Sequence, residues 1–452
     1  GKVGTNSLGA VSLFTDAVST TGSLTIDAAS SLSMQSLTTD AATLDIDGAG
    51  SVTIASAAGV AQAITDANLV TIDASDLEGG VTLALNTQLT SFKGGKGADS
   101  ITTAAVAALS SIDAGDGTDT LTIGTASDLN STTTGAKYKG FDVLVGAAAG
   151  ALSGAWVPSV TALVTVGGTS ITNLDATQAS ALSTAADSAS LSVSLTSSSG
   201  TSDVMSLTLN SAADKEAADI AGALTVSGFE TISLTAAPSS SALSGGAATS
   251  TIGSFSGTSL TAINLSGTAF DLGNIATTRP VVIDGTALTG DRQVATQGLT
   301  VAGSATAGST ITGSDYIDTF TIGAEGSTYN GGAGDDVFTT TVTILTADGS
   351  TDLKINGGTN SGAVTSANDQ LVISDAAPTL TDNQFTYVTG FETLTLSGTG
   401  DMSLTTGGAF NTAFADGVTI TTGALAQTKD IQLVAGLSSV DIALTVTATS
   451  LT

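Results

Sequence analysis

Nine-residue segments rich in glycine and aspartate are the part of this sequence best suited to chemistry. Residues 94–102 (GGKGADSIT) and 331–339 (GGAGDDVFT) fit the pattern G-G-x-G-x-D-x-U-x at every defined position, where U is apolar. Residues 114–122 differ only by Ala114 in place of the first glycine. Glycine allows turns that a β-carbon forbids, and carboxylate and carbonyl oxygens are the ligands that Ca²⁺ prefers. The pattern therefore predicts calcium-binding loops.

The ninefold phase extends towards the N-terminus from the last of these segments. Ile311, Phe320, Tyr329 and Phe338 follow one another at this nine-residue spacing. Residues 313–320 fill a further unit, in which Asp315 and Asp318 are candidate metal ligands. Residues 355–358 (INGG) begin another unit, which reaches its candidate ligand Asp369 only after an insertion.

Two nine-residue units would make one coil of a β-solenoid. Asp318 and Asp336 are separated by two whole units, and Asp99 and Asp119 by two units and a slip of two positions. We therefore expect the loops of successive coils to stack, so that carboxylates and backbone carbonyls from two coils surround one Ca²⁺ ion.

Two other interpretations of the glycine loops are open. A phosphate-binding loop also uses glycines, but it requires a helix N-terminus and a lysine, whereas here acidic residues precede a strand. The glycines could also be ordinary turns in a chain that contains 54 of them. The coil-length spacing of the aspartates favours calcium.

The composition excludes several classes of function. The chain has 40 acidic and 10 basic residues among 452, a formal charge of −30, so neither nucleic acid nor an anionic membrane is an expected partner. It contains no cysteine and no histidine, which removes disulfides, zinc sites of the His/Cys type and Ser-His-Asp catalysis. No HExxH motif is present, and we expect a protein that is not an enzyme.

The ends of the sequence carry no targeting signal. No apolar run reaches the length of a membrane helix, and the first residues lack the features of a signal peptide. The sequence begins with glycine, so we expect that an upstream segment was removed or lies outside it.

Short runs that alternate Val, Ile or Leu with Thr or Ser predict a mostly β protein. Between residues 23 and 59 the runs recur at roughly 20-residue intervals, as in a parallel β-solenoid or β-roll. Short helices are expected near residues 175–189 and 211–224. We expect five segments: a solenoid (1–135), a β-rich module with short helices (136–235), a β-rich connector (236–300), a β-roll (301–400) and a β-rich C-terminal segment (401–452).

A Gly-Phe-acid module occurs three times. Phe141, Phe229 and Phe391 each follow a glycine and precede an acidic residue, and each comes at a similar interval after an aspartate that begins a predicted strand. We predict that these phenylalanines close coils of the core. The acids that follow them, Asp142, Glu230 and Glu392, are predicted to be turn or capping groups rather than ligands.

The nonapeptides resemble the RTX calcium-binding repeats of proteins exported by type I secretion. The scattered repeats, the Ala/Thr/Ser/Gly richness and segments such as 200–211 (GTSDVMSLTLNS), 228–234 (GFETISL) and 260–273 (LTAINLSGTAFDLG) are similar to calcium-dependent surface-layer (S-layer) proteins of Gram-negative bacteria. The resemblance implies carboxylate ligands and carbonyl ligands at the matching positions. The carboxylate ligands would be Asp99, Asp119, Asp318 and Asp336, and the carbonyl ligands would be those of Gly94, Lys96, Ala114, Asp116, Gly331 and Ala333.

The same resemblance implies a secreted structural subunit of a self-assembling, two-dimensional cell-surface lattice, with calcium driving folding and subunit association. The expected partners are further copies of this chain, the type I secretion machinery, and lipopolysaccharide through a domain outside this sequence. The alternative is a calcium-stiffened adhesin or biofilm-fibre protein.

Overall fold

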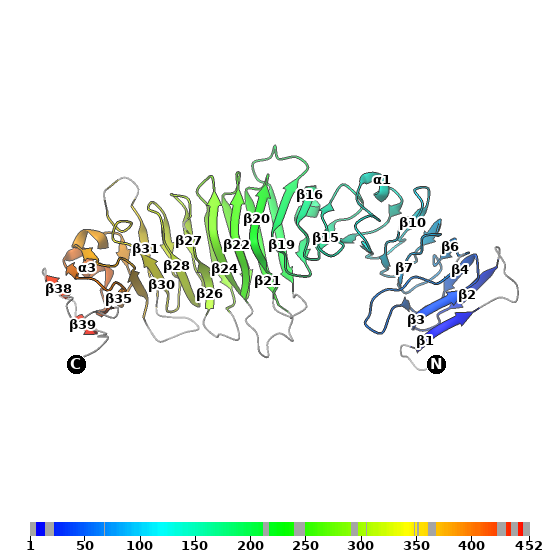
Figure 1. Ribbon diagram of the computed structural model, residues 1–452, viewed down its shortest axis with the longest axis horizontal. Coiled ribbons are helices and arrows are strands. Elements are labelled where there is room, and N and C mark those ends of the chain that lie inside the picture. The colour runs from blue at the N-terminus through cyan, green and yellow to red at the C-terminus, as the bar shows by residue number, and fades with distance from the viewer. Residues whose placement is uncertain are drawn as a thin grey trace. The chain divides into compact units, whose positions relative to one another are not determined.

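The computed structural model is almost entirely β, with parallel strands that stack side by side and three short α-helices (Figure 1). It describes residues 6–13, 22–66, 68–210, 217–238, 249–290, 297–303, 305–347, 349, 352–359, 368–422, 431–434 and 442–445. The chain divides into two compact units, Gly1–Ser183 and Thr184–Thr452. The expected parallel β-solenoid is confirmed, whereas the five finer segments stay predictions.

In the first unit, successive coils add one strand to each of two parallel sheets. One sheet contains β1 (Asn6–Leu13), β3 (Leu32–Thr39), β5 (Val52–Ile54), β7 (Val81–Ala84), β9 (Ser100–Thr102), β11 (Thr120–Thr122), β13 (Val143–Val145) and β15 (Ala162–Thr165). The other contains β2 (Ser23–Asp27), β4 (Thr43–Asp47), β6 (Thr71–Asp73), β8 (Ser91–Lys93), β10 (Ser111–Asp113) and β12 (Tyr138–Lys139). The remaining elements are α1 (Thr132–Gly135), β14 (Leu152–Ser153), β16 (Ser170–Leu174) and α2 (Ala176–Ala179), and β17 (Leu182–Thr184) lies at the division.

The second unit repeats this arrangement with longer strands at its start. One sheet contains β19 (Val204–Asn210), β21 (Thr231–Ala237), β23 (Ala262–Gly267), β25 (Val282–Leu288), β27 (Thr310–Thr312), β29 (Thr328–Asn330), β31 (Lys354–Asn356) and β34 (Val388–Thr389). The other contains β18 (Leu191–Leu195), β20 (Ile220–Ser227), β22 (Thr249–Gly257), β24 (Ala269–Thr277), β26 (Gln297–Val301), β28 (Ile317–Thr321), β30 (Val337–Thr340), β32 (Gln370–Ile373), β35 (Thr393–Leu396), β37 (Val418–Thr422) and β39 (Ile442–Thr445).

A third, small sheet and two short helices complete the second unit. The sheet contains β33 (Thr379–Leu380), β36 (Met402–Thr405) and β38 (Ile431–Val434), and the helices are the 3₁₀-helix η2 (Asp382–Phe385) and α3 (Gly408–Ala413). Among the residues described, no helix is long and apolar enough to cross a membrane.

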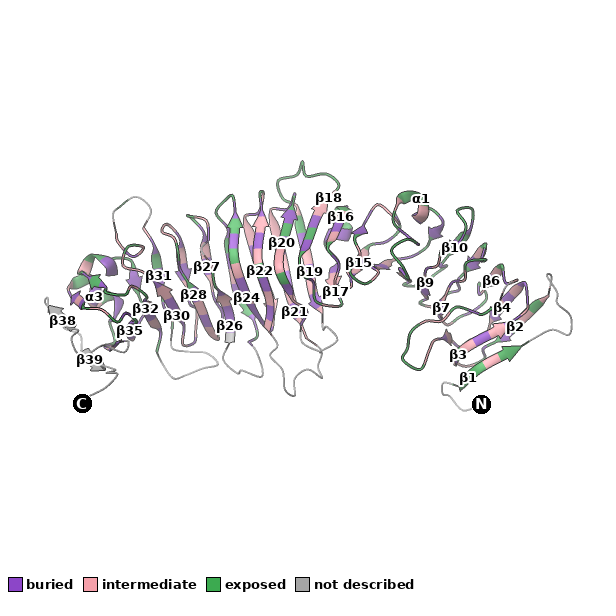
Figure 2. Cartoon of the chain, viewed as in Figure 1, coloured by how far each residue is buried: buried purple, intermediate pink, exposed green. Residues whose placement is uncertain are grey.

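The strands form because apolar and polar residues alternate with the two-residue period of a β-strand. In β4, for example, Leu44 and Ile46 are buried and the three residues around them are half-buried. Figure 2 shows the same alternation along most strands of both units. Parallel, in-register stacking then places each inward residue over its equivalent in the next coil, which gives continuous apolar ladders.

The ladders confirm the ninefold phase of the sequence. Ile311 pairs with Tyr329 between β27 and β29, and Phe320 pairs with Phe338 between β28 and β30. All four side chains are at most 1% exposed. Two nine-residue units therefore make one coil, with one strand in each sheet. Likewise Leu24 pairs with Leu44, which confirms the interval predicted near the N-terminus.

The helix predictions are correct only in part. Asp175 caps α2 through its side chain, but the helix ends at Ala179 and gives way to β17. The helix predicted over 211–224 is wrong from Ile220 onwards, because these residues form β20, and residues 211–216 lie outside the described part. Phe141, Phe229 and Phe391 are buried as predicted.

Phe338 should be among the most sensitive positions of the core. Its ring lies 4.9 Å from that of Phe320 and 5.3 Å from that of Phe391, between centroids. We expect Phe338→Ala to lower the free energy of unfolding by about 3–5 kcal/mol, measured by chemical denaturation in calcium. Thr339→Ala, on the outer side of the same strand, is the matched control and should change it by less than about 1 kcal/mol. Equal effects of the two substitutions would contradict the assignment of β30's inner face.

Candidate metal centre

The glycine-aspartate loops lie at the corners of the coils, where one strand ends and the next begins. In the first unit the loops connect β8 to β9 and β10 to β11, and each presents an aspartate, Asp99 or Asp119, directly before the next strand. In the second unit Asp336 precedes β30, Asp369 precedes β32, and Asp318 is the second residue of β28. Because the strands stack in register, these aspartates also stack.

In the first unit the stacked carboxylates form a column held by backbone hydrogen bonds. The Val81 amide donates to Asp99 Oδ1 at 2.6 Å, and the Asp99 amide donates to Asp119 Oδ1 at 2.7 Å. The Asp119 amide in turn donates to Asp142 Oδ2 at 2.8 Å. Each carboxylate thus binds the backbone of the coil before it. We call Asp99, Asp119 and Asp142 the first carboxylate column.

The second unit contains a longer column of the same kind. Asp318 Oδ1 accepts a hydrogen bond from the Leu299 amide, and Asp336 Oδ1 accepts one from the Asp318 amide at 2.8 Å. The Asp336 amide donates to Asp369 Oδ1, and the Asp369 amide donates to Glu392 Oε2, both at 2.8 Å. We call Asp318, Asp336, Asp369 and Glu392 the second carboxylate column.

The two columns end at the acids of the Gly-Phe-acid module. Asp142 and Glu392 each accept the amide of the column's last aspartate, and Glu230 does the same for Asp203 at 2.8 Å. This confirms the predicted capping role of the three acids. The column itself was not predicted, although the similar interval between each strand-leading aspartate and the following Gly-Phe-acid module was its signal in the sequence.

Four of the six column aspartates have one oxygen without a partner among the described residues. The Oδ2 atoms of Asp99, Asp119, Asp336 and Asp369 are buried and accept no hydrogen bond of normal geometry there, although the Gly95 amide partly offsets the raised pKa of Asp99. Asp318 differs, because its Oδ2 accepts hydrogen bonds from the amide and the hydroxyl of Ser314. A buried carboxylate oxygen with no donor is costly unless a proton or a cation compensates it.

Two of these orphaned oxygens point at a glycine, and a carbonyl of the next coil points at the same place. A β-carbon on Gly94 would collide with both Asp99 Oδ2 and the Ala114 carbonyl oxygen. A β-carbon on Gly331 would collide with Asp336 Oδ2 and the Gly357 carbonyl oxygen. We call these two arrangements the glycine cradles.

A similar arrangement occurs over Gly313. Here the converging oxygens are Asp318 Oδ2 and the Gly331 carbonyl oxygen. The loops of residues 114–122 and 331–339 are alike in backbone, since Gly117 and Gly334, which occupy the same place in the pattern, both have φ of 130°. That conformation is open to glycine and strained for other residues.

The cradles fit the donor set of a hard cation. Each supplies one carboxylate oxygen and one backbone carbonyl oxygen, on a coil corner where no β-carbon intrudes. Within the described residues, no three acidic side chains are arranged to hold one metal ion. A bound cation would therefore depend on backbone carbonyls for most of its protein ligands, as calcium sites can.

The structure divides the predicted ligands into three groups. Those that meet in or beside a cradle are Gly94, Asp99, Ala114, Asp318, Gly331 and Asp336. Asp119 and Asp369 belong to the columns, each with a buried, orphaned oxygen. The others lie around the loops: Lys96 is exposed and pairs with Glu78, Asp116 and Asp315 are exposed, and the Ala333 amide donates to the Ser314 carbonyl at 2.9 Å. Metal binding by any of these residues stays a prediction.

Burial changes the proton affinity of the columns. Loss of water around the carboxyl raises the pKa of Asp99, Asp318 and Asp369 to about 7 and that of Asp336 to about 9. The neighbouring charge of Asp318 adds to the effect on the pKa of Asp336. These column carboxyls are thus buried, repeated from coil to coil, and raised in pKa.

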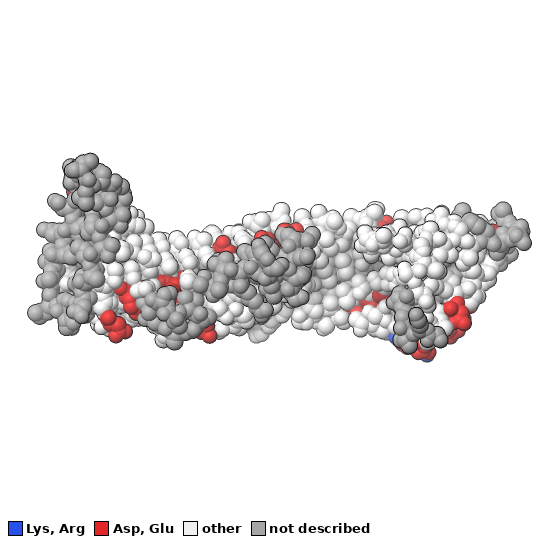
Figure 3. Space-filling model, turned by 90° about the horizontal axis from the view of Figure 1, so that it is seen from below, with Lys and Arg blue, Asp and Glu red and all other residues white. Residues whose placement is uncertain are grey.

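On the face in Figure 3 the visible acids form small groups on a largely uncharged surface.

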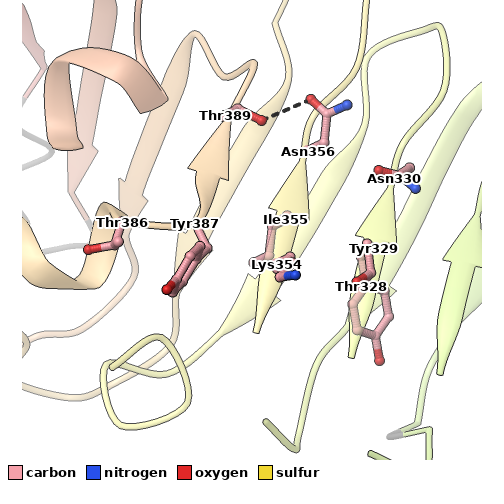
Figure 4. Close-up of a pocket in the computed structure, with 9 residues that line it drawn as sticks. All are labelled: Thr328, Tyr329, Asn330, Lys354, Ile355, Asn356, Thr386, Tyr387 and Thr389. Atoms are coloured by element: carbon pink, nitrogen blue, oxygen red, sulfur yellow. Dashed lines mark hydrogen bonds between the residues drawn. The ribbon is translucent and has the colours of Figure 1, made fainter. Parts of the chain in front are cut away.

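A shallow groove on the second unit is another concave feature. It has a volume of about 230 Å³ and lies over β29, β31 and β34, where Figure 4 shows Asn330, Lys354, Asn356 and Tyr387 on the outer face. The Thr389 hydroxyl donates to Asn356 Oδ1 at 3.2 Å. Its lining residues include no carboxylate, so the groove holds no pair of groups for general acid–base catalysis.

The raised pKa values predict an unusual pH dependence for the calcium-free protein. In the unfolded chain these aspartates lose their protons near pH 4, whereas in the folded chain they keep them up to about pH 7–9. Stability is therefore present at low pH and is lost as pH rises through 7 to 9. We expect the melting temperature in EGTA to be higher at pH 5.5 than at pH 8.5, and saturating calcium to flatten the difference. A calcium-free protein that is most stable at pH 8.5 would contradict the burial of these carboxyls.

Comparison with known proteins gives no relative for this chain. No protein-family model matches the sequence, and neither curated proteins nor solved structures match it significantly. The columns and cradles are therefore the features from which a function can be argued.

Proposed function

We propose that this chain is a calcium-dependent structural protein, a subunit of a self-assembling S-layer on the surface of a Gram-negative bacterium. The observation that carries the calcium part is the repeated convergence of an orphaned carboxylate oxygen and a carbonyl oxygen over a glycine. The RTX-like pattern of the same loops supports the extracellular setting.

Calcium suits these loops better than other biological metals. The chain has no cysteine or histidine, so soft or borderline metals that prefer thiolate and imidazole would have no such ligand. Magnesium requires a nearly ideal octahedron and keeps several waters, whereas calcium accepts six to eight oxygens in flexible geometry. Asp99 with the Ala114 carbonyl, and Asp336 with the Gly357 carbonyl, would hold such ions, and the remaining column aspartates would serve neighbouring sites.

The columns supply a mechanism by which calcium controls folding. Without a cation, ionised aspartates stacked in the interior repel one another and lack solvation, so the coils are destabilised as these groups lose their protons. Occupancy at ten times the dissociation constant adds about 1.4 kcal/mol per site. Several sites together would approach the stability of a whole domain, about 5–15 kcal/mol. The chain would thus pass through type I secretion unfolded and fold in external calcium.

A structural role agrees with what the surface offers. The acidic groups with the largest pKa shifts are buried in the stack rather than placed in a cleft, and the groove over β31 has no acid–base pair. We propose a structural role rather than an enzymatic one. Further copies of this chain would be its main partners, and a domain outside this sequence would provide attachment to lipopolysaccharide.

Assembly is tested by electron microscopy of the purified chain with millimolar calcium and with EGTA. Two-dimensional crystalline sheets that form in calcium and dissolve in EGTA are the expected result. Isolated fibres would instead support the adhesin or biofilm-fibre function. Single particles in calcium, or sheets that persist in EGTA, would contradict the proposal.

Metal binding is tested at Asp336, whose partnerless Oδ2 lies in a glycine cradle. Asp336→Asn keeps the size of the side chain but removes its charge. We expect the stabilisation gained from calcium at pH 7.5 to fall by at least about 1.4 kcal/mol, and the stability in EGTA to rise because a buried carboxyl is removed, by thermal unfolding and calorimetric titration. Asp416→Asn removes an exposed carboxylate of the second unit outside the glycine loops and should leave both values unchanged. An Asp336→Asn protein that binds as many calcium ions, as tightly, as the natural chain would contradict the assignment.

A further inference from the structure

Charged side chains alternate in sign along one outer row of the first unit. In the sheet that contains β4, β6, β8, β10 and β12, one row runs Asp45, Asp73, Lys93, Asp113, Lys139, each residue in register with the next. Over the last four strands the signs are minus, plus, minus, plus. Only 10 basic residues occur in the whole chain, and two of them occupy alternate places in this row.

The row stands out from its surroundings. Lys93, Asp113 and Lys139 are exposed, and the side chain of Asp73 is 36% exposed. The row beside it contains only small hydroxyl residues on three successive strands, Thr71, Ser91 and Ser111. On the other side the chain turns into the glycine loops. The two lysines therefore extend furthest from this face, whereas Asp73 and Asp113 each use one oxygen to accept a hydrogen bond from their own turn.

If a second copy presents the same four alternating charges in the opposite strand order, each charge faces one of opposite sign. A two-fold rotation of a second copy about an axis parallel to the strands, between β8 and β10, reverses the order of its strands. Asp73 of one copy then faces Lys139 of the other, and Lys93 faces Asp113. The remaining two contacts follow by symmetry, and Asp45 lies beyond the edge of the paired row. Every charge of the four-strand row thus meets an opposite charge, as an isologous interface requires.

We propose that this row is a two-fold contact between two copies of the chain, with Asp73, Lys93, Asp113 and Lys139 forming four reciprocal ion pairs. The contact itself does not depend on the proposed function. Its role as one of the subunit contacts of the array does. Exposed ion pairs are individually weak, so the isolated dimer is weak as well and gains strength from repetition in the array.

Pairing within one chain is the competing explanation for the alternation. Opposite charges on adjacent strands also stabilise a stack, and Lys93 Nζ does lie 3.7 Å from Asp73 Oδ2. Lys93 and Asp73 are, however, the one pair of this row within ion-pair distance among the described residues. The two explanations differ in one respect, because only a contact between chains can be restored by mixing two different variants.

The test uses the full chain at about 0.15 M salt, with the lowest calcium concentration that keeps it folded. Lys93→Glu and Asp113→Lys each turn two attractive contacts of a homodimer into two repulsive ones. We expect each variant alone to lose self-association by at least about tenfold, measured by sedimentation velocity. An equimolar mixture should regain it, because the new carboxylate at position 93 in one copy meets the new ammonium at position 113 in the other. Native mass spectrometry should then show a one-to-one heterodimer.

A second reciprocal pair guards against a variant that fails to fold. Lys139→Glu and Asp73→Lys should behave in the same way, alone and mixed, and circular dichroism in calcium reports the fold of each. Lys354→Glu reverses an exposed strand lysine of the second unit and should leave association unchanged. Unaltered association of the single variants, a mixture no better than its components, or a natural chain that stays monomeric at high concentration would each overturn the contact.

The mixing test of the contact and the microscopy test of the proposed function can fail independently. Sheets that form in calcium while the mixture shows no recovery would refute the contact alone. Recovery in the mixture, with no sheets at any calcium concentration, would refute the array and support the contact.

Discussion

The hydrogen bond from a strand-leading backbone amide to an aspartate of the next coil is the interaction on which this architecture depends. It links the coils at their corners, where the Asp318 amide binds Asp336 and the Asp336 amide binds Asp369. Because each aspartate both donates through its backbone and accepts through its side chain, the bonds form a continuous chain across coils. A slip of one residue would remove the donor and would also turn the apolar ladder outwards. The columns therefore fix the register that the weakly patterned strands alone would leave loose.

The same interaction creates the chemical problem that the glycine loops can solve. A carboxylate that uses one oxygen for the backbone keeps a second oxygen, and burial removes water from it. Glycine at the corner leaves room beside that oxygen and brings a carbonyl of the next coil towards it, at Gly94 and again at Gly331. A proton or a divalent cation can compensate the charge there. Where Ser314 stands in place of a glycine, its amide and hydroxyl take this role for Asp318 instead.

Sequence periodicity was enough to predict the coil but not its internal bonding. The apolar residues from Ile311 to Phe338 are spaced nine apart. Two nine-residue units make one coil, and each unit contributes one strand with one apolar residue to the core, so alternate units belong to opposite sheets. The link between Asp336 and Asp369 was harder to foresee, since they lie 33 positions apart and the intervening insertion breaks the phase. The helix predicted over residues 211–224 failed from Ile220 onwards, because helix-favouring residues there pair with strands on both sides, as β20 does with β18 and β22.

In-register parallel stacking has opposite consequences for charge inside and outside the solenoid. Stacking places each residue beside its equivalent in the next coil, about 4.8 Å away. A repeated aspartate at an inner corner therefore gives a column of like charges, which adds to the effect of burial in raising the pKa of Asp336. On the outer face the sequence need not repeat, and the signs from Asp73 to Lys139 alternate. The negative charge of the inner column must be neutralised by protons or cations, whereas each charge of the outer row lies beside a charge of opposite sign. One geometry can in this way make the fold respond to calcium and leave a face suited to another copy of the chain.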